Sequence, residues 1–163
     1  MAQEIIPFIS GYLSQWYRSE FKIGSRRFNC AEQYMMYAKA RLFGDAAKAK
    51  RILKADHPKD QKRLGRAVQG FDQAIWDAEK YNIVLDANRA KFSQNRRLGK
   101  KLLSTGDAVL VEGNVKDPVW GVALRVDDPR IFDPAEWRGE NLLGKILMQV
   151  RSELADKADP TPM

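Results

Sequence analysis

The sequence has very few of the residues that bind metals or form crosslinks. It contains one cysteine, Cys30, and one histidine, His57, among 163 residues. A single cysteine excludes an intrachain disulfide, and one thiol with one imidazole is too small a ligand set for a zinc site. We therefore expect a protein that needs no metal and no other cofactor.

Long apolar segments are also missing. No stretch approaches the roughly 18 apolar residues that a membrane-spanning helix needs, and residues 1–4 (MAQE) lack the basic start and apolar run of a secretion signal. Repeats and low-complexity tracts are absent as well. We expect a cytoplasmic protein without a membrane partner.

The composition is that of a globular chain. Hydrophobic residues make up 44% of the sequence and include 4 Trp, 5 Tyr and 7 Phe, which is enough for a buried core. We predict one domain over residues 1–155. The polar, proline-containing residues 156–163 (DKADPTPM) predict a disordered tail.

The hydrophobic pattern predicts a helix-rich α+β domain with a small β-sheet. Short aromatic runs at residues 7–9, 21–23 and 26–28 predict the sheet. Helical periodicity follows over residues 31–43, 46–54, 58–66, 76–92 and 97–103. Residues 108–112 (AVLVE) alternate like a strand, and residues 141–154 are typical of an amphipathic helix.

The charge balance favours a polyanionic partner. The net charge is +7, from 28 Lys and Arg against 21 Asp and Glu, which points towards DNA, RNA or phosphorylated small molecules. The cations are densest in residues 48–66 and 89–101. Cations that only solvate helix faces are the alternative, and composition leaves both open.

The first candidate site lies at the start of the helix predicted at residues 31–43. Residues 29–32 (NCAE) have the spacing of a capping box, in which Asn29 caps the helix and Glu32 reaches back. Glu32, Met35, Met36 and Lys39 also share one helix face. That face combines an acid and an amine with apolar groups, as a partly buried site requires. The alternatives are that Glu32 is only a cap and that Lys39 is a solvated cation near the helix end.

Two further candidate segments follow. In residues 112–121 (EGNVKDPVWG) a strand ends in a polar loop, where binding residues concentrate; the alternative is an ordinary turn started by Asp117, with Trp120 returning to the core. In residues 137–145 (WRGENLLGK) the free amides of a helix start, with Arg138 and Lys145, would hold a phosphate. Glycine before a helix is common, so this signal is weak by itself.

Together these segments resemble the NADAR domain family. Residues 11–21 (GYLSQWYRSEF) are similar to the family's opening FLSNFYPSPF, and Lys39 follows Glu32 by seven residues, as in its EHxxQxxK helix. Further matches are residues 64–66, Trp76, and residues 89–95, 103–106, 117–121, 137–145 and 150–151. The resemblance extends over residues 8–154.

Three positions depart from the family pattern. Gln33 stands where histidine is frequent, Gln15 where asparagine is usual, and Glu140 where lysine often precedes the asparagine. The change at Glu140 weakens the expectation of a phosphate contact in that loop.

The resemblance implies a hydrolase, an N-glycosidase that cleaves a ribose C1–N bond. Two substrate classes are implied: ADP-ribose attached to guanine, including guanine in DNA, and the ribosylamino-pyrimidine phosphates of riboflavin synthesis. We expect ADP-ribosylated guanine in DNA to be the substrate, with the riboflavin intermediates as the alternative. A module that only binds ADP-ribose or nucleic acid is the competing class, and a basic protein that coats DNA is a third.

The resemblance also implies the site residues. Cleavage builds positive charge on the ribose, so the site needs a carboxylate, a proton for the departing base and a nucleophile. The expected catalytic residues are Glu32, Lys39 and Asp117. We expect Lys39 to attack C1 and form a Schiff base once desolvation lowers its pKa, Glu32 to move protons, and Asp117 to hold the ribose hydroxyls or the developing cation. Trp76 and Trp120 would stack on a base. The full set of expected substrate-binding residues is Trp16, Tyr17, Trp76, Trp120, Gly121, Arg138, Gly139 and Asn141.

Overall fold

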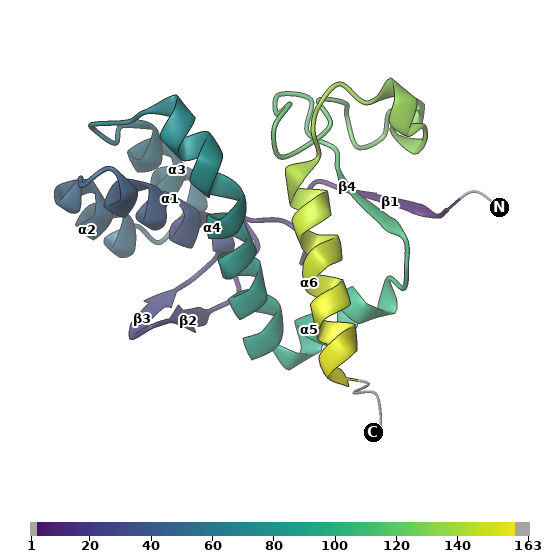
Figure 1. Cartoon of the computed structure of the whole chain (residues 1–163), viewed down its shortest axis with the longest axis horizontal. Helices are drawn as coiled ribbons and strands as arrows, with labels where there is room; N and C mark the ends of the chain where they lie inside the picture. Colours follow the sequence, from purple (N-terminus) through teal and green to yellow (C-terminus); the bar gives the residue numbers. More distant parts are fainter. Residues whose placement is uncertain (1–2, 159–163) are drawn as a thin grey trace. The chain divides into compact units, whose positions relative to one another are not determined.

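The computed structural model describes residues 3–158, and helices predominate in it (Figure 1). Contacts group these residues into two compact units. The central unit is the continuous segment Gln15–Asn95, and the terminal unit is built from residues 3–14 and 96–158. The predicted helix-rich α+β class is confirmed.

The central unit consists of four helices and a hairpin. Its helices are α1 (Ala31–Leu42), α2 (Ala46–Lys54), α3 (Pro58–Arg66) and α4 (Gln73–Gln94), and α1 packs against the other three. Strands β2 (Phe21–Ile23) and β3 (Arg26–Phe28) pair antiparallel, with Gly24 in the left-handed conformation (φ +61°) at the turn. α1 is thus the element around which this unit is organised.

Local sequence explains where these helices begin. Asp45 and Asp72 accept the Lys48 and Ile75 amides at the starts of α2 and α4. At α3, His57 is the cap and Pro58 occupies the first turn, where its missing N–H is harmless. Because Asp72 is the cap, α4 begins at Gln73, earlier than the predicted residue 76.

The core of the central unit joins the hairpin to α1 and α4. Phe21 and Phe28 stack with ring centroids 5.9 Å apart, and both are buried against Ala31, Ala87 and Ala90. Alanine at these three helix positions lets the aromatic rings approach the helix backbones closely. This packing fixes the first turn of α1, where Glu32 lies.

The terminal unit is built on a pairing of distant strands. β1 (Ile5–Phe8) runs parallel to β4 (Val109–Glu112), with Ile5 opposite Val109. Helix α6 (Leu142–Ala158) packs on β4, and α5 (Arg96–Ser104) packs on α6. The opening strands therefore do not form one sheet, contrary to the prediction, because β1 pairs with β4 and β2 pairs with β3.

Close approach of α6 to β4 depends on a glycine. A Cβ atom on Gly144 would lie 2.0 Å from the Leu110 carbonyl oxygen and 2.3 Å from Asn141 Nδ2, so no larger residue fits without a shift. Val111 of β4 belongs to a buried cluster with Val122, Leu124 and Ile131. Ile131 lies in the first of two short 3-10 helices, η1 (Pro129–Phe132), and η2 (Pro134–Glu136) follows it.

The predicted tail begins too early. α6 continues to Ala158, so residues 156–158 are helical. They contain no helix breaker, and the first proline comes at Pro160. The rest of the predicted tail, residues 159–163, lies outside the described residues. No helix within residues 3–158 has the length and apolar character to cross a membrane.

Candidate active site

The start of α1 differs from the predicted capping box. The N-cap is Cys30, whose side chain makes no capping hydrogen bond. The side chain that reaches back is Gln33, whose Oε1 accepts the Asn29 N–H at 2.7 Å. The prediction that Asn29 caps the helix and Glu32 closes the box is therefore wrong. Because the helix starts at Ala31, the cap is Cys30 and the side chain that reaches back is Gln33, each one residue later than predicted. Glu32 is nevertheless buried, with 4% of its surface exposed.

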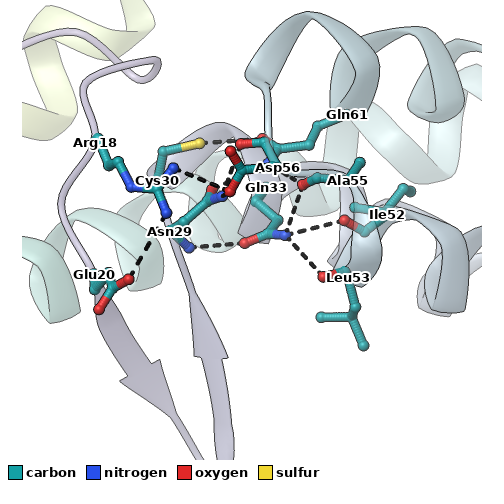
Figure 2. A network of polar contacts seen from close by, with 10 residues as sticks. All are labelled: Arg18, Glu20, Asn29, Cys30, Gln33, Ile52, Leu53, Ala55, Asp56 and Gln61. Atoms are coloured by element: carbon teal, nitrogen blue, oxygen red, sulfur yellow. Dashed lines mark hydrogen bonds and ion pairs between the residues drawn. The ribbon is translucent and has the colours of Figure 1, made fainter.

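Gln33 belongs to a polar network that ties α1 to α2 and α3 (Figure 2). Its Nε2 donates to the Ile52 carbonyl at 3.0 Å, at the end of α2. Gln61 of α3 donates to Asn29 Oδ1 at 3.0 Å and accepts the Cys30 thiol at 3.1 Å. Gln33 stands where histidine is frequent in the family, and its amide accepts one hydrogen bond and donates another. The network holds the first turn of α1 rigidly and satisfies carbonyls at the end of α2.

Lys39 lies two turns further along α1, against two aromatic rings. Its Nζ is 4.7 Å from the ring centroid of Phe71 and 5.5 Å from that of Trp76. Burial lowers the pKa of Lys39; the negative charge of Glu32 opposes this, and the Arg66 guanidinium adds to it. Lys39 is half-buried rather than solvated, so the predicted face with Glu32 and an amine of lowered pKa is present. A lowered pKa increases the neutral, nucleophilic fraction of the amine.

Phe71 is an aromatic residue that sequence reasoning missed. It is 42% exposed, whereas Trp76 is 8% exposed, so Phe71 offers the open aromatic face beside Lys39. Phe43 holds it edge-on with ring centroids 5.3 Å apart. Its position in a loop, between Gly70 and the helix cap Asp72, was the available signal. The predicted stacking role of Trp76 stays a prediction, and Trp76 mainly walls in Lys39.

Lys91 of α4 was also missed as a site residue. Its side chain is fully buried, and burial lowers its pKa to about 7. Its Nζ lies 5.8 Å from the ring centroid of Tyr17 and 4.9 Å from that of Phe92. Helical spacing carried a signal, since Lys91 falls on the same α4 face as the buried Val84, Ala87 and Asn88.

Glu32, Cys30 and Lys91 share one electrostatic environment. Burial raises the pKa of the Cys30 thiol to about 11; the charge of Glu32 raises it as well, and the charge of Lys91 lowers it. The thiol therefore stays protonated at neutral pH, which makes Cys30 a poor nucleophile. Of the buried groups near Glu32, the amines are the reactive candidates.

Gln15 connects the segment before β2 to this region. Its carbonyl accepts the Glu32 N–H at 3.0 Å, and its Oε1 accepts Asn88 Nδ2 at 2.9 Å. The next two residues are the predicted binding residues Trp16 and Tyr17, which are 43% and 36% exposed. The central unit thus holds Glu32, Lys39, Trp16, Tyr17 and Trp76 of the predicted site.

The remaining predicted residues belong to the terminal unit, and Asp117 starts a turn there. Its Oδ1 accepts hydrogen bonds from the amides of Val119 and Trp120 at 3.0 and 2.9 Å. These contacts are those of an aspartate that starts a turn, which was the alternative to a binding role. Trp120 is half-buried. A Cβ atom on Gly121 would lie 2.8 Å from the Glu112 carbonyl oxygen and 3.1 Å from Glu112 Oε2. Glycine here lets the Glu112 carboxylate approach the loop that Asp117 organises.

The amides at the start of α6 are not free, contrary to the prediction. They donate to the carbonyls of residues 118–122, and the donors are Arg138, Glu140, Asn141, Leu142 and Leu143. The reason is that residues 137–141 pair with this loop before the helix begins at Leu142. A phosphate would have to displace these bonds.

Asn141 and Gly139 have structural contacts in the same segment. The buried Asn141 has a left-handed backbone (φ 55°), and its side chain bonds the Leu110 carbonyl and the Glu112 N–H. A Cβ atom on Gly139 would lie 2.4 Å from the Gly121 carbonyl oxygen. Arg138 is exposed. Substrate contacts by Asp117, Trp120, Gly121, Arg138, Gly139 and Asn141 stay predictions. Within residues 3–158, no three His, Cys, Asp or Glu side chains cluster as a metal site would require.

Comparison with known proteins places the chain in a family. Residues 8–155 match the NADAR domain, and the chain belongs to the NADAR domain family. It is 43% identical over 145 residues to N-glycosidase R617 of Acanthamoeba polyphaga mimivirus, covering 86% of this chain and 85% of that protein. It is 30% identical over 148 residues to Riboflavin biosynthesis protein VVA0006 of Vibrio vulnificus (strain YJ016), covering 91% of this chain but 36% of that protein.

A solved structure shares the fold. The NMR structure of the E. coli protein YbiA superposes with a TM-score of 0.79 at 28% identity and covers 100% of this chain and 92% of that one. YbiA is named an N-glycosidase. Relatives along most of the chain thus carry the name of a hydrolase, and the prediction of an enzyme of the hydrolase class is confirmed at the level of the family.

Proposed function

We propose that the protein is an N-glycosidase that removes ADP-ribose from guanine in DNA, with Lys39 as the nucleophile. The observation that carries this proposal is the half-buried Lys39 amine, whose pKa is lowered, on the helix face of the buried Glu32. The exposed ring of Phe71 beside Lys39 supports it, since a planar base or adenine stacks on such a face.

These groups suit a balanced two-stage reaction. Glu32 first takes up the proton that Lys39 gives up as its amine becomes neutral. Neutral Lys39 then bonds to ribose C1 while the C1–N bond breaks, and the departing guanine nitrogen takes this proton from Glu32. The C1–O bond of the ribose ring then breaks as protons leave Lys39 Nζ and one of them passes to the ring oxygen, which gives an open-chain Schiff base between Nζ and C1. Water, deprotonated by Glu32, adds to this imine and releases ADP-ribose and the free amine. The net reaction consumes one water and needs no oxidant. Asp117 holding the ribose stays a prediction.

A second substrate class has support from the relatives' names. Proteins of riboflavin biosynthesis are similar to this chain, both in Vibrio vulnificus and in Zea mays. Their similarity favours a ribosylamino-pyrimidine phosphate as the alternative substrate. The same Lys39 and Glu32 chemistry would apply, because the bond broken is again ribose C1 to nitrogen.

The deciding experiment offers both substrates to the protein and traps the intermediate. We expect faster product release from guanine-ADP-ribosylated DNA, and borohydride added during turnover should leave the sugar on a peptide containing Lys39. Lys39→Arg should abolish trapping and turnover, because a guanidinium stays protonated, while the exposed Lys50→Arg should change neither. Faster product release from the ribosylamino-pyrimidine phosphate would show that this alternative is the preferred substrate. Normal turnover by Lys39→Arg would remove the amine from the mechanism, and binding without product would indicate a binding module.

A further inference from the structure

One face of α5 carries only cations and a hydroxyl. This face lines a hollow of about 560 Å³, and the lining residues are Arg96, Arg97, Lys100, Lys101 and Ser104. All five are exposed. The opposite side of the helix is buried through Leu98, Gly99 and Leu102, which fixes which face points outwards. We call the five lining residues the α5 basic face.

The charges of the α5 basic face are not neutralised within the protein. Across residues 3–158, none of its four cations forms an ion pair, and α5 contains no acidic residue. In the other basic block, residues 48–66, two of the eight cations are ion-paired: Lys48 with Asp45 and Arg63 with Asp60. The α5 basic face therefore presents concentrated positive charge.

The stability of α5 by itself does not explain this arrangement. Arg96 and Arg97 occupy the first turn of α5, next to the positive end of the helix dipole, where cations are disfavoured and acids are preferred. An arrangement that opposes local stability is expected where function requires it. An anion bound at this end would be attracted both by the arginines and by the dipole.

We propose that the α5 basic face is the docking surface for the phosphate backbone of DNA. The face extends over about 12 Å from Arg96 to Ser104, at 1.5 Å per residue, and one DNA strand places a phosphate about every 3.4 Å along its axis. The four cations, Arg96 to Lys101, take up about 7.5 Å of this length, and the face as a whole, with Ser104, meets about three to four phosphates, whereas one phosphate group is too small to meet all of it. The choice of DNA among nucleic acids rests on the proposed function.

The surroundings of the face fit a polyanion better than a membrane. Of the three leucines of α5, Leu98 and Leu102 are buried and Leu103 is half-buried, and none of them lines the basic face, so α5 has no apolar face to insert into lipid. Tyr12 also holds Lys101 at one side of the hollow. Tyr12 donates its hydroxyl to the Lys101 carbonyl at 3.2 Å, and its ring centroid lies 5.4 Å from Lys101 Nζ. A preformed surface loses little freedom when it binds.

The test measures binding of an unmodified, fluorescently labelled DNA duplex between 50 and 200 mM salt. Neutralising four phosphates predicts a slope of log affinity against log salt of about −3.6, or roughly 150-fold weaker binding across this range. Arg97→Gln/Lys100→Gln should halve the slope and leave roughly a 12-fold change. The matched control Lys50→Gln/Arg51→Gln removes the same charge from exposed positions of α2 and should keep the full slope.

The outcomes separate this proposal from the proposed function. With a single ADP-ribosylated guanosine as substrate, Arg97→Gln/Lys100→Gln should turn over normally, and its loss should appear only with DNA. Lys39→Arg should bind DNA normally without turning over either substrate; turnover by that variant would refute the mechanism and leave the docking surface intact. An unchanged slope in the α5 variant, or a loss confined to the α2 control, overturns the docking surface. Equally tight, α5-dependent binding of polyglutamate or of the matching RNA overturns its assignment to DNA.

Discussion

Lys91 makes the stability of the protein depend on pH in a defined direction. The fully buried amine has a pKa lowered by burial to about 7, against an ordinary value of 10.5. Between these values the unfolded chain binds a proton that the folded chain does not. Stability therefore rises with pH through this window and is lowest below pH 7, where folding must bury a charge.

The size of the effect follows from the same two values. One pH unit with a full proton difference is worth about 1.4 kcal/mol. From pH 7 to 8.5 the difference in bound protons between the unfolded and folded chain grows from one half to nearly one, so the free energy of unfolding should rise by about 1.6 kcal/mol. The Cys30 thiol, with its pKa raised to about 11, works in the opposite direction only as pH passes its ordinary value of 9.0. The window below pH 8.5 therefore reports on Lys91.

Urea unfolding at several pH values between 7 and 8.5 measures this effect. Lys91→Met keeps an unbranched side chain of similar size and removes the titrating group, so most of the rise should disappear. The exposed Lys50→Met should keep it. The pKa of Lys39 is also lowered, but its contribution to the pH dependence of stability is the same in the wild type and in Lys91→Met. A wild-type stability that stays flat or falls over this range, or a Lys91→Met protein that keeps the full rise, would refute the reasoning.

Three further predictions concern catalysis and packing. Glu32→Gln should lower kcat by about 100- to 10,000-fold while urea unfolding still shows a folded protein, because Gln33, and not Glu32, accepts the Asn29 N–H at the start of α1; near-normal turnover would reduce Glu32 to a structural residue. Phe71→Ala should raise KM by roughly 5- to 150-fold through a lost stacking contact, and Phe71→Trp should keep the wild-type KM. An equal rise of KM in the variant Ile75→Ala, at another exposed apolar residue, would count against a specific stacking role of Phe71. Gly144→Ala should lower stability by about 1–3 kcal/mol through overpacking against Leu110, and an unchanged Tm would contradict that packing.

The helical framework was predictable because it rests on local periodicity. The face of Glu32 and Lys39 followed from helical spacing alone, and the structure has that face. The cap was misplaced by one residue, since Asn29 uses its side chain to contact Gln61 and Asp56 instead of the α1 amides. That choice depends on α2 and α3, which the local sequence does not contain.

Long-range contacts explain the other misses. The amides before α6 looked free because their acceptors lie in the preceding loop, at residues 118–122. Lys91 belongs to the basic block at residues 89–101, and its burial was not predictable from that pattern, because burial of an amine depends on what covers it. Phe71 gained its place beside Lys39 only through the packing of the α3–α4 loop on α1.

The parallel pairing of β1 with β4 sets an order in which the chain is able to fold. β1 is synthesised before its partner, Val109–Glu112, which follows only after the whole central unit. Until then Ile5, Ile6 and Phe8 form an apolar strand with an open edge, the kind of segment that aggregates. Closing so long a loop is costly for a flexible chain, and a central unit already folded shortens it. The terminal unit is thus completed last. Slow or interrupted synthesis therefore lengthens the time during which β1 is unpaired and open to aggregation.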